Sequence, residues 1–464
     1  MTDLRDKIAE HSAHVAVIGL GYVGLPLATA FARAGFRTTG VELNQHKVDA
    51  ITAGQSYIPD VPSDDLAPHV QAGRLTATSD YDALLEVDAM FICVQTPYDA
   101  QRAPDLSYIR AASQSIRSRL KPGQLVVLQS TTYPGTTEEI VQPILEESGL
   151  QAGADFYLAF SPERIDPGNK QWSAYNTPKV VGGVTPECTR LAAELLRQMG
   201  APVCTVSSAR AAELTKLLEN TFRAVNIALV NELALLAERM GIDFWEVIEA
   251  ARTKPFGFMP FYPGPGVGGH CIPVDPYYLS WKAREYDYYT EFIELAGEVN
   301  QAMPHHVVDL MGQALSLHGK PLRDARVLVL GVAFKPGIDD ARNSPAERII
   351  ELLLSRGARV RYHDPYVPRF QVGNDVFHCE TVVLESVPLT EEEIGAADCV
   401  AIVTGHRNLD YRHIVEHAAL VVDTCNATAG AGQGREKVVR LGTPLPAPAR
   451  RSGAKPLCPT RLPL

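Results

Sequence analysis

A single cysteine lies in a stretch that cannot form a regular helix or strand. Residues 263–276 consist mostly of glycine and proline around Cys271, and the stretch closes with Asp275 and Pro276. Glycine permits positive φ and close backbone approach, whereas proline fixes φ and removes a donor. Asp275 followed by Pro276 predicts a helix start, with Asp275 as the N-cap. A thiolate near a helix N-terminus is stabilised, so Cys271 is a candidate nucleophile; the alternative is a buried cysteine in a plain connector.

A second pair of polar residues has helical spacing. Apolar residues recur every three or four positions over residues 209–240, which predicts one helix of roughly 45 Å at 1.5 Å per residue. Lys216 and Asn220 are i and i+4 on that helix and share one face. If this face is buried between domains, the pair can bind an oxyanion or a hydroxyl group. The alternative is an ordinary solvated face.

The elements that must position these residues begin with a nucleotide-binding pattern. Gly19, Gly21 and Gly24 lie between a short apolar run and a predicted helix, and a second apolar run ends at Glu42. The order is strand, turn, helix, strand over residues 14–18, 19–24, 25–34 and 36–41. This order is typical of a dinucleotide site, in which Glu42 would accept hydrogen bonds from a ribose and repel a 2′-phosphate. We therefore expect NAD rather than NADP.

Polar residues follow the next predicted strands. Thr96 follows the strand over residues 89–94 and Thr131 follows the strand over residues 125–129, so both should lie over a bound cofactor. Glu163 follows the strand over residues 156–160 and is a candidate acid/base. The alternative for Glu163 is a solvated ion pair with Arg164.

A second alternating region begins near residue 326 without a glycine turn of the first kind, so it does not imply a second dinucleotide. Lys335 and Arg342 follow its first strand and could meet phosphates. The sequence thus predicts an α/β protein with two Rossmann-like doubly wound domains joined by a long central helix. The expected boundaries are residues 1–208, 209–316 and 317–440, with a disordered proline-rich tail over residues 441–464.

The composition limits the kinds of molecule that the protein can bind. The 464 residues carry a net charge of −11, which argues against nucleic acid. The N-terminus lacks an apolar leader and no apolar run is long enough for a bilayer, so we expect a cytoplasmic protein without membrane contact. The 8 cysteines include no Cys-x-x-Cys pair, so we predict no metal site and no disulfide framework.

The order of motifs resembles one family, the UDP-glucose/GDP-mannose dehydrogenases, over nearly the whole chain. The residues that carry the resemblance are Gly19, Gly21, Gly24, Pro26, Ser130, Thr131, Ser161, Pro162, Glu163, Arg164, Glu213, Lys216, Asn220, Gly268, Gly269, Cys271, Phe334, Lys335, Asp339 and Arg342. The resemblance implies an NAD domain, a long helix used in dimerisation and a smaller sugar-nucleotide domain. We accordingly expect a homodimer or a higher homo-oligomer.

The resemblance also implies catalytic roles. Cys271 would be the nucleophile and Lys216 would stabilise developing oxyanions. Asn220 would hold the substrate or a water molecule, and Asp275 with Thr131 would position the water. Glu163 would assist as an acid/base in hydrolysis.

Contacts to the two small molecules are expected from further residues. For NAD we predict contacts from Gly19, Gly21, Tyr22, Val23, Gly24, Glu42, Thr96, Thr131, Lys335 and Arg342. For the sugar nucleotide we predict contacts from Glu163, Arg164, Lys216, Asn220, Tyr262, Gly268 and Lys335.

The expected reaction is a four-electron oxidation of a nucleotide sugar at C6 through a cysteine thiohemiacetal and thioester. Val274 stands where the UDP-glucose enzymes usually have lysine, and the surrounding residues look like the branch that acts on N-acetylhexosamines. We expect UDP-N-acetylglucosamine as the substrate, for bacterial surface polysaccharides, with UDP-N-acetylmannosamine or UDP-glucose as alternatives. Two more remote alternatives are a two-electron hydroxy-acid dehydrogenase and a redox-sensing NAD-binding protein.

Overall fold

The computed structural model divides the chain into two compact units. It describes residues 3–97, 103–166, 168–169, 171–270, 272–373 and 381–445. Unit 1 comprises Met1–Ala224 and His270–Glu294, and unit 2 comprises Val225–Gly269 and Leu295–Leu464. Within the described ranges, no helix is both long enough and apolar enough to cross a bilayer.

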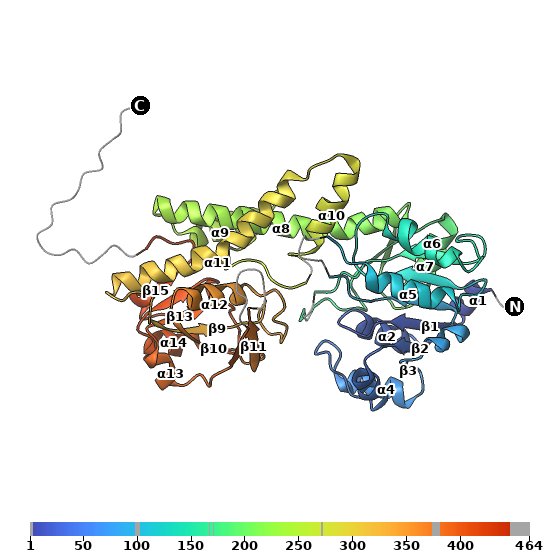
Figure 1. Cartoon of the computed structure of the whole chain (residues 1–464), viewed down its shortest axis with the longest axis horizontal. Helices are drawn as coiled ribbons and strands as arrows, with labels where there is room; N and C mark the ends of the chain where they lie inside the picture. Colours follow the sequence, from blue (N-terminus) through green and yellow to red (C-terminus); the bar gives the residue numbers. More distant parts are fainter. Residues whose placement is uncertain are drawn as a thin grey trace, which may run out of the picture. The chain divides into compact units, whose positions relative to one another are not determined.

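Unit 1 is built on an eight-stranded sheet with the order β3-β2-β1-β4-β5-β6-β7-β8 (Figure 1). Its strands are β1 (His14–Ile18), β2 (Arg37–Val41), β3 (Leu75–Thr78), β4 (Ala89–Ile92), β5 (Leu125–Leu128), β6 (Tyr157–Phe160), β7 (Lys179–Gly183) and β8 (Val203–Thr205). Neighbours pair in parallel, except that β6 and β7 are antiparallel. The carboxyl ends of β1, β2, β4, β5 and β6 therefore share one edge.

Helices cover both faces of this sheet. Val15 and Val17 of β1 belong to one apolar cluster, whereas Ala16 and Ile18 belong to the cluster on the other face. The helices are α1 (Leu4–Ala9), α2 (Gly24–Arg33), α3 (Gln45–Thr52), α4 (Ser63–Gln71), η1 (Tyr81–Glu86), α5 (Ser107–Arg117), η2 (Thr137–Val141), α6 (Gln142–Glu146), α7 (Pro186–Arg197), α10 (Asp275–Ala283) and η3 (Arg284–Tyr286). Because a strand buried on both faces packs apolar residues to both sides, β1 reads as a continuous apolar run from Val15 to Ile18, after the buried His14.

Two long helices contribute residues to both units. The helix α8 (Ala209–Met240) has 32 residues, and α11 (Glu291–Leu317) has 27. The predicted bounds of α8 are confirmed. Its large apolar residues that remain exposed are Leu214, Leu218, Phe222, Leu229, Leu233, Leu236 and Met240.

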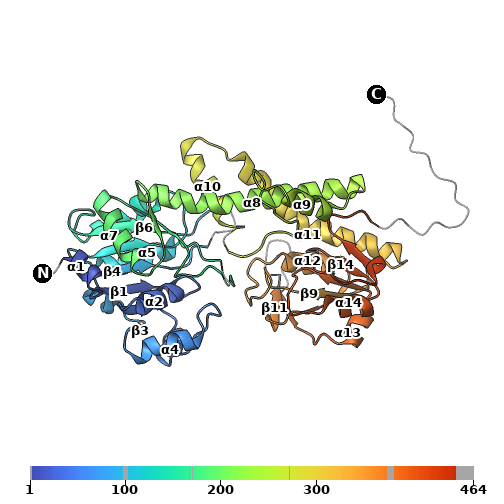
Figure 2. The ribbon, with the colours of Figure 1, turned by 180° about the vertical axis from the view of Figure 1, so that it is seen from behind.

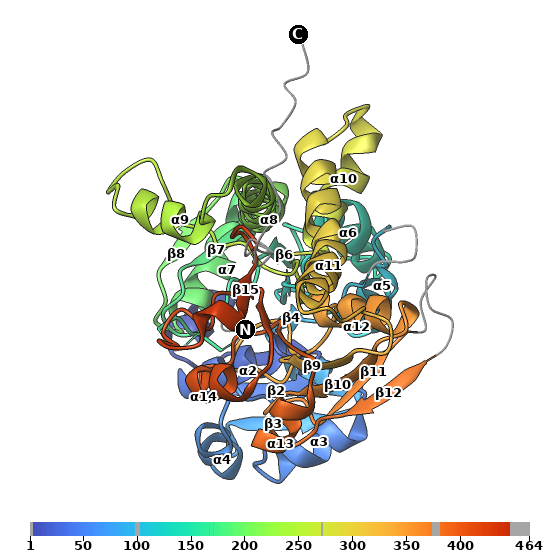
Figure 3. The same ribbon diagram turned by 90° about the vertical axis from the view of Figure 1, so that its left-hand side faces the viewer.

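Unit 2 is built on a parallel five-stranded sheet with the order β10-β9-β13-β14-β15. Figure 2 labels β9 and β14 of this sheet. Its strands are β9 (Arg326–Leu330), β10 (Arg359–His363), β13 (Cys399–Ile402), β14 (Val421–Asp423) and β15 (Val438–Arg440). An antiparallel pair, β11 (Arg369–Val372) and β12 (Val382–Glu385), lies beside β10 (Figure 3). The remaining helices are α9 (Phe244–Arg252), α12 (Pro345–Ser355), α13 (Glu391–Ala396), α14 (Tyr411–His417) and η4 (Arg435–Lys437).

The second sheet is also covered on both faces. Val327 and Val329 of β9 face one apolar cluster, and Leu328 and Leu330 face another. The predicted fold class, two Rossmann-like α/β sheets and a long helix, is confirmed.

The first residues of the predicted tail are ordered. Leu441 is fully buried, and its carbonyl oxygen accepts a hydrogen bond of 2.7 Å from the indole N–H of Trp245. The prediction of disorder from residue 441 is therefore wrong for this short stretch, because its backbone is anchored against α9. Residues 446–464 lie outside the described residues.

Candidate active site

The turn between β1 and α2 has the packing that a dinucleotide requires. Gly19 has φ of +87°, and a Cβ there would lie 2.7 Å from the carbonyl oxygen of Cys93. A Cβ on Gly24 would lie 1.8 Å from the carbonyl oxygen of Gly19. A Cβ on Gly21, by contrast, would meet no atom of the described residues within 4 Å, apart from its two chain neighbours. Gly19 and Gly24 are thus needed by the protein itself, whereas Gly21 leaves the backbone open to a ligand.

The acidic residue of the pattern lies next to this turn. The Glu42 carboxylate accepts hydrogen bonds from the backbone N–H groups of Leu20 and Asn44, each at 3.0 Å. Its side chain is largely buried, at 13% exposure, and Lys47 Nζ lies 3.7 Å from it. Glu42 therefore lies directly after β2, and its carboxylate is hydrogen-bonded to Leu20 in the glycine turn. The N-terminus of α2 follows directly, where Tyr22 is partly buried and Val23 is the N-cap.

The ends of β4 and β5 are tied together. The Ser130 hydroxyl donates to the carbonyl oxygen of Val94 at 2.7 Å. The Thr96 carbonyl oxygen accepts a hydrogen bond from the phenol of Tyr278, a fully buried residue of α10. Thr131, which follows Ser130, is partly exposed. Thr96 and Thr131 thus follow neighbouring strands at the edge that carries the glycine turn, as predicted.

Lys216, Asn220 and Asp275 form a buried polar cluster in unit 1. Lys216 and Asn220 are 8% and 6% exposed on α8, and Asp275 is 2% exposed. The Asn220 side-chain amide donates to the Asp275 carboxylate at 2.5 Å. The alternative of a solvated helix face is therefore wrong. These three residues combine a cation, an amide and a carboxylate in a site with little water.

Asp275 does not have the capping role predicted for it. It is the first residue of α10, Val274 is the N-cap, and the cap makes no side-chain hydrogen bond. The N-cap lies one residue before the predicted one. The Asp275 carboxylate is hydrogen-bonded to Asn220 instead of to the first turn of α10. Burial raises the pKa of Asp275 to about 6, although the Lys216 charge and the Asn220 hydrogen bond oppose this rise. The side chain can therefore exchange a proton near neutral pH.

Glu163 belongs to a separate buried group. Its two carboxylate oxygens lie 3.1 and 3.0 Å from Nζ of Lys179, which is itself fully buried. Gln129 donates to the same carboxylate at 2.9 Å. Burial favours the neutral acid, but the Lys179 charge and the hydrogen bonds outweigh it and lower the pKa of Glu163. Glu163 is consequently an ionised acceptor at neutral pH.

The alternative that pairs Glu163 with Arg164 in solvent is also wrong. The Arg164 guanidinium lies 2.6 Å from the carboxylate of Glu219, and it donates to the carbonyl oxygen of Pro178 at 2.8 Å. Only the backbone N–H of Arg164 reaches Glu163, at 2.7 Å. Arg164 therefore links the loop after β6 to α8, one residue before Asn220.

The predicted residues of unit 2 also lie close to one another. The loop around Gly268 packs so tightly that a Cβ there would lie 2.7 Å from Cβ of Phe334 and 2.9 Å from the carbonyl oxygen of Asn343. The next residue, Gly269, donates through its N–H to the carbonyl oxygen of Arg342 at 3.0 Å. The structure thus brings two predicted motifs together, the glycine loop and the segment after β9.

The other predicted residues of unit 2 are engaged as follows. The Arg342 guanidinium forms an ion pair of 2.6 Å with Asp340. The Tyr262 hydroxyl donates to Glu249 at 2.9 Å, and its ring stacks on Trp245. Lys335 Nζ lies 5.9 Å from the ring centroid of Phe334. Cys271, the predicted nucleophile, lies outside the described residues.

Lys179 and Glu213 are buried charged residues near the predicted site, and neither was predicted from the sequence to be a site residue. Lys179 is the first residue of β7, a position where a polar residue is common, so nothing in the sequence indicated that it is buried. Glu213, quoted above only as part of a motif, accepts hydrogen bonds from Gly135 N–H, from Thr137 N–H at 2.9 Å and from the Thr137 hydroxyl at 2.7 Å. Burial raises the pKa of Glu213 to about 7 despite these bonds. Glu213 fastens α8 to the loop that follows Thr131.

Known proteins match the chain along most of its length. Three models of the UDP-glucose/GDP-mannose dehydrogenase family match it: the NAD binding domain at residues 13–200, the central domain at residues 210–302 and the UDP binding domain at residues 328–430. A UDP-N-acetyl-D-glucosamine 6-dehydrogenase of Pseudomonas aeruginosa is 39% identical over 395 residues, which are 84% of this chain and 90% of that protein. A UDP-N-acetyl-D-mannosamine dehydrogenase of Pyrococcus horikoshii is 39% identical over 354 residues, 76% of this chain and 84% of the relative.

A solved structure agrees with the sequence matches. The UDP-D-ManNAc dehydrogenase from Pyrococcus horikoshii superposes with a TM-score of 0.83 at 34% identity, over 92% of this chain and 99% of the other. The glycine turn, Glu42 and the open backbone at Gly21 fit the NAD that the family uses. The chain therefore belongs to the UDP-glucose/GDP-mannose dehydrogenase family and is an NAD-dependent UDP-sugar dehydrogenase.

Proposed function

We propose that the enzyme oxidises UDP-N-acetyl-D-glucosamine at C6 to the uronate, for the synthesis of bacterial surface polysaccharides. The observation that carries the chemistry is the buried cluster of Lys216, Asn220 and Asp275, of which Asp275 is four residues beyond Cys271. The Pseudomonas aeruginosa relative is a UDP-N-acetyl-D-glucosamine 6-dehydrogenase, which supports the choice of sugar and of C6.

The reaction needs two oxidations and one hydrolysis. Bound NAD would supply the hydride acceptor for each oxidation. The C6 alcohol first loses a proton and a hydride and becomes an aldehyde, to which the Cys271 thiolate adds as a thiohemiacetal. Loss of a second proton and hydride leaves a thioester. Water then attacks the thioester carbon, which releases the carboxylate and restores the thiol.

Lys216 and Asn220 would stabilise the oxygen of the reacting carbon. Each step places negative charge on that oxygen, and a cation with an amide donor lowers its energy most where water is excluded. Both side chains are nearly buried, which supports this role. Asn220 would also keep Asp275 in place through their hydrogen bond.

Asp275 is the residue that we assign to activation of the hydrolytic water, with Thr131 as a second positioning group. A carboxyl group whose pKa is raised to about 6 is still mostly ionised at neutral pH, and it is more basic than an ordinary aspartate. It can take a proton from water as the thioester is attacked. The nearby Lys216 charge keeps the ionised form accessible.

Glu163 is better suited to positioning than to proton donation. Its carboxylate is held ionised by Lys179 and also accepts hydrogen bonds from the backbone N–H groups of Arg164 and Ile165. We therefore assign Glu163 to holding the loop after β6 in the shape that binds substrate. Arg164 of the same loop remains a proposed substrate contact.

The remaining assignments complete the proposal. NAD would be bound by the glycine turn with Tyr22, Val23 and Glu42, by Thr96 and Thr131, and by Lys335 and Arg342. Tyr262, Gly268 and Lys335 would contact the sugar nucleotide. The boundaries 1–208, 209–316 and 317–440 are proposed for the NAD, central and sugar-nucleotide domains. The exposed apolar residues of α8 support a homodimer through this helix, because a second copy would bury them.

UDP-N-acetyl-D-mannosamine is the second candidate substrate. The Pyrococcus horikoshii relative and its solved structure both carry that sugar in their names. The two sugars differ only in the configuration at C2, so the chemistry at C6 is the same for both.

A comparison of kcat/KM tests the choice of sugar. The purified enzyme is supplied with NAD and, in separate assays, with UDP-N-acetylglucosamine, UDP-N-acetylmannosamine, UDP-N-acetylgalactosamine and UDP-glucose. We expect the first sugar to have the highest kcat/KM, by at least about tenfold, the scale of a difference of ~1.4 kcal/mol in transition-state binding. A higher value for UDP-N-acetylmannosamine would change the sugar and keep the mechanism. No turnover on any of the four would contradict the proposed function.

A further inference from the structure

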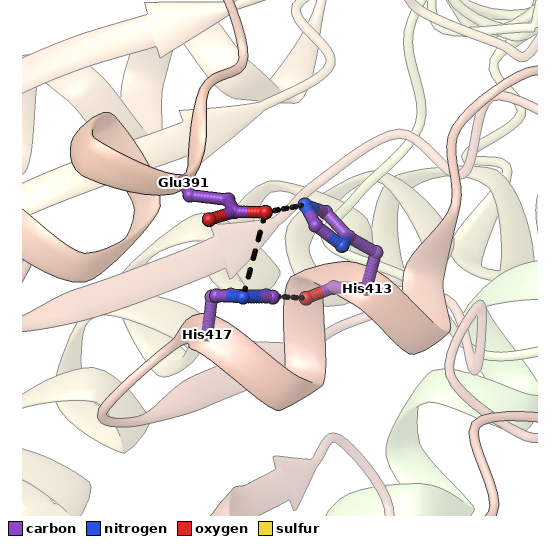
Figure 4. Close-up of side chains that lie close together, drawn as sticks. All are labelled: Glu391, His413 and His417. Carbon is purple, nitrogen blue, oxygen red and sulfur yellow. Dashed lines mark hydrogen bonds and ion pairs between the residues drawn. The ribbon is translucent and has the colours of Figure 1, made fainter.

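Two histidines and a glutamate converge on the surface of unit 2, and none of them is among the residues assigned above. His413 and His417 are i and i+4 on α14, so their rings project from one face, and Glu391 is the first residue of α13. The Nε2 atoms of His413 and His417 lie 3.8 and 3.7 Å from the same oxygen of Glu391 (Figure 4). The three potential ligand atoms all lie within 4.8 Å of one another.

In His417, Nδ1 is used in a hydrogen bond, and Nε2 faces the Glu391 carboxylate. Its Nδ1 lies 2.9 Å from the backbone carbonyl oxygen of His413, and because that oxygen can only accept, Nδ1 carries the hydrogen. In the neutral ring Nε2 then has a lone pair. A lone pair on Nε2 and the lone pairs on Glu391 cannot bond to each other, and 3.7 Å is also longer than a normal N–H···O hydrogen bond.

The spacing of the three atoms suits a metal ion. A tetrahedral Zn²⁺ with bonds of about 2.0–2.1 Å separates its ligand atoms by roughly 3.3 Å. The two distances from Glu391, 3.8 and 3.7 Å, therefore need to shorten by about half an ångström, and the separation of the two histidine nitrogens is at most 4.8 Å before a metal draws them together. The Nδ1–H···O=C bond of His417 is the kind of outer contact that fixes the ring of a metal-binding histidine.

The two helices that carry the ligands share one core. Ile394 of α13 and Ile414 and Val415 of α14 belong to the same buried apolar cluster, and the helices pack side by side. The ligands are therefore presented by elements already fixed in position. The three consecutive glutamates that begin α13 add negative charge near the site, although Glu393 is paired with Arg361 at 2.7 Å.

We propose that Glu391, His413 and His417 form a Zn²⁺ site that links α13 to α14. Two imidazoles and one carboxylate favour a borderline metal such as Zn²⁺ over Mg²⁺ or Ca²⁺, which prefer oxygen ligands only. Three protein ligands leave a fourth position for water. The lack of Cys-x-x-Cys pairs predicted no metal site, whereas the signal in the sequence is His413-x-x-x-His417.

Zinc binding to the full-length protein tests the proposal. After removal of metal with a chelator, Zn²⁺ is titrated by calorimetry into the parent, the double variant His413→Ala/His417→Ala, and the control His318→Ala, which removes another exposed histidine of unit 2. We expect the parent and the control to bind one more Zn²⁺ per chain than the double variant. Glu391→Gln should weaken that site by at least about tenfold.

Two further readouts separate this site from the thiols of the chain. Co²⁺ at the proposed site should give visible d–d bands without a thiolate charge-transfer band, and those bands should be absent from the double variant. Zn²⁺ should raise the unfolding temperature of the parent but not that of the double variant, because it binds only the folded site. Equal Zn²⁺ stoichiometry in the parent and the double variant would overturn the proposal, as would displacement of Zn²⁺ by equimolar Mg²⁺ or Ca²⁺.

Discussion

Replacing Lys179 with methionine isolates the buried ion pair that holds Glu163. Lys179 is fully buried and Glu163 is 6% exposed, so the variant leaves a carboxylate in the interior without its cation. Removing one partner of a buried pair costs about 3–5 kcal/mol. Because Gln129 and two backbone N–H groups still bind the carboxylate, we expect the lower end, about 3 kcal/mol. For a unit of this size that corresponds to a fall in unfolding temperature of roughly 6–12 °C.

The loss should depend on pH with a definite sign. In the parent the pKa of Glu163 is lowered, so the stabilisation is present above the ordinary glutamate value of about 4.3 and is lost as the pH falls through the folded value. Without Lys179, burial raises the pKa of Glu163, and the penalty grows as the pH rises above about 4.3. The difference between the parent and the variant should therefore be largest near pH 7 and should shrink steadily as the pH falls, to its minimum below the lowered pKa of Glu163 in the parent.

Thermal unfolding across pH checks this reasoning. The double variant Lys179→Met/Glu163→Gln should recover at least half of the lost stability, because neither charge of this pair remains in the interior. The matched control is Arg190→Met, which breaks the exposed pair of Arg190 and Glu187 in the same unit and should cost less than about 1 kcal/mol. A pH-independent loss, or a double variant no more stable than Lys179→Met, would refute the account of Glu163.

Two other predictions follow from the site. Gly21→Ala should fold with parental stability but raise the Kd for NAD at least about tenfold, because its Cβ meets no atom of the described residues beyond its chain neighbours and faces the proposed cofactor position. Gly24→Ala should instead lower the unfolding temperature, because its Cβ would meet the Gly19 carbonyl oxygen. Unchanged NAD binding in Gly21→Ala, measured by titration, would contradict the role of the turn. The pH profile of kcat should fall below about pH 6 as Asp275 becomes protonated, and Asn220→Ala should move that limb to higher pH because it removes a hydrogen bond to the ionised carboxylate. An acid limb that does not move in Asn220→Ala would exclude Asp275 as the titrating group.

The elements of this protein could be predicted from its sequence because local pattern and tertiary environment agree in them. The strand over residues 14–18 is buried at every position and apolar from Val15 to Ile18 because both of its faces are covered, and α8 ends where its helical periodicity ends. The position of Lys216 and Asn220 on one face followed from helical spacing alone. The hydrogen bond of Asn220 to Asp275 did not, because Asp275 lies on α10, 55 residues further along the chain.

The errors have the same physical origin. The sequence suggested the neighbouring Arg164 as the ion-pair partner of Glu163. The partner in the structure is Lys179, 16 residues away on β7. Adjacent residues of an extended chain point to opposite sides, so adjacency is a poor guide to ion pairs. Asp275 was predicted to cap a helix because Asp-Pro commonly begins one, but the hydrogen bond from Asn220 claims its carboxylate. Contacts of this kind come from packing between elements, which local rules do not contain.

The number of NADH molecules formed per sugar tests the central claim most directly. UDP-N-acetylglucosamine is supplied in limiting amount with excess NAD, and NADH is measured at completion for the parent and for Cys271→Ala. We predict close to two NADH per sugar for the parent, with the uronate as product, and a variant that stalls before the second oxidation. One NADH per sugar for the parent, or two for Cys271→Ala, would contradict the thioester route and the role of Cys271.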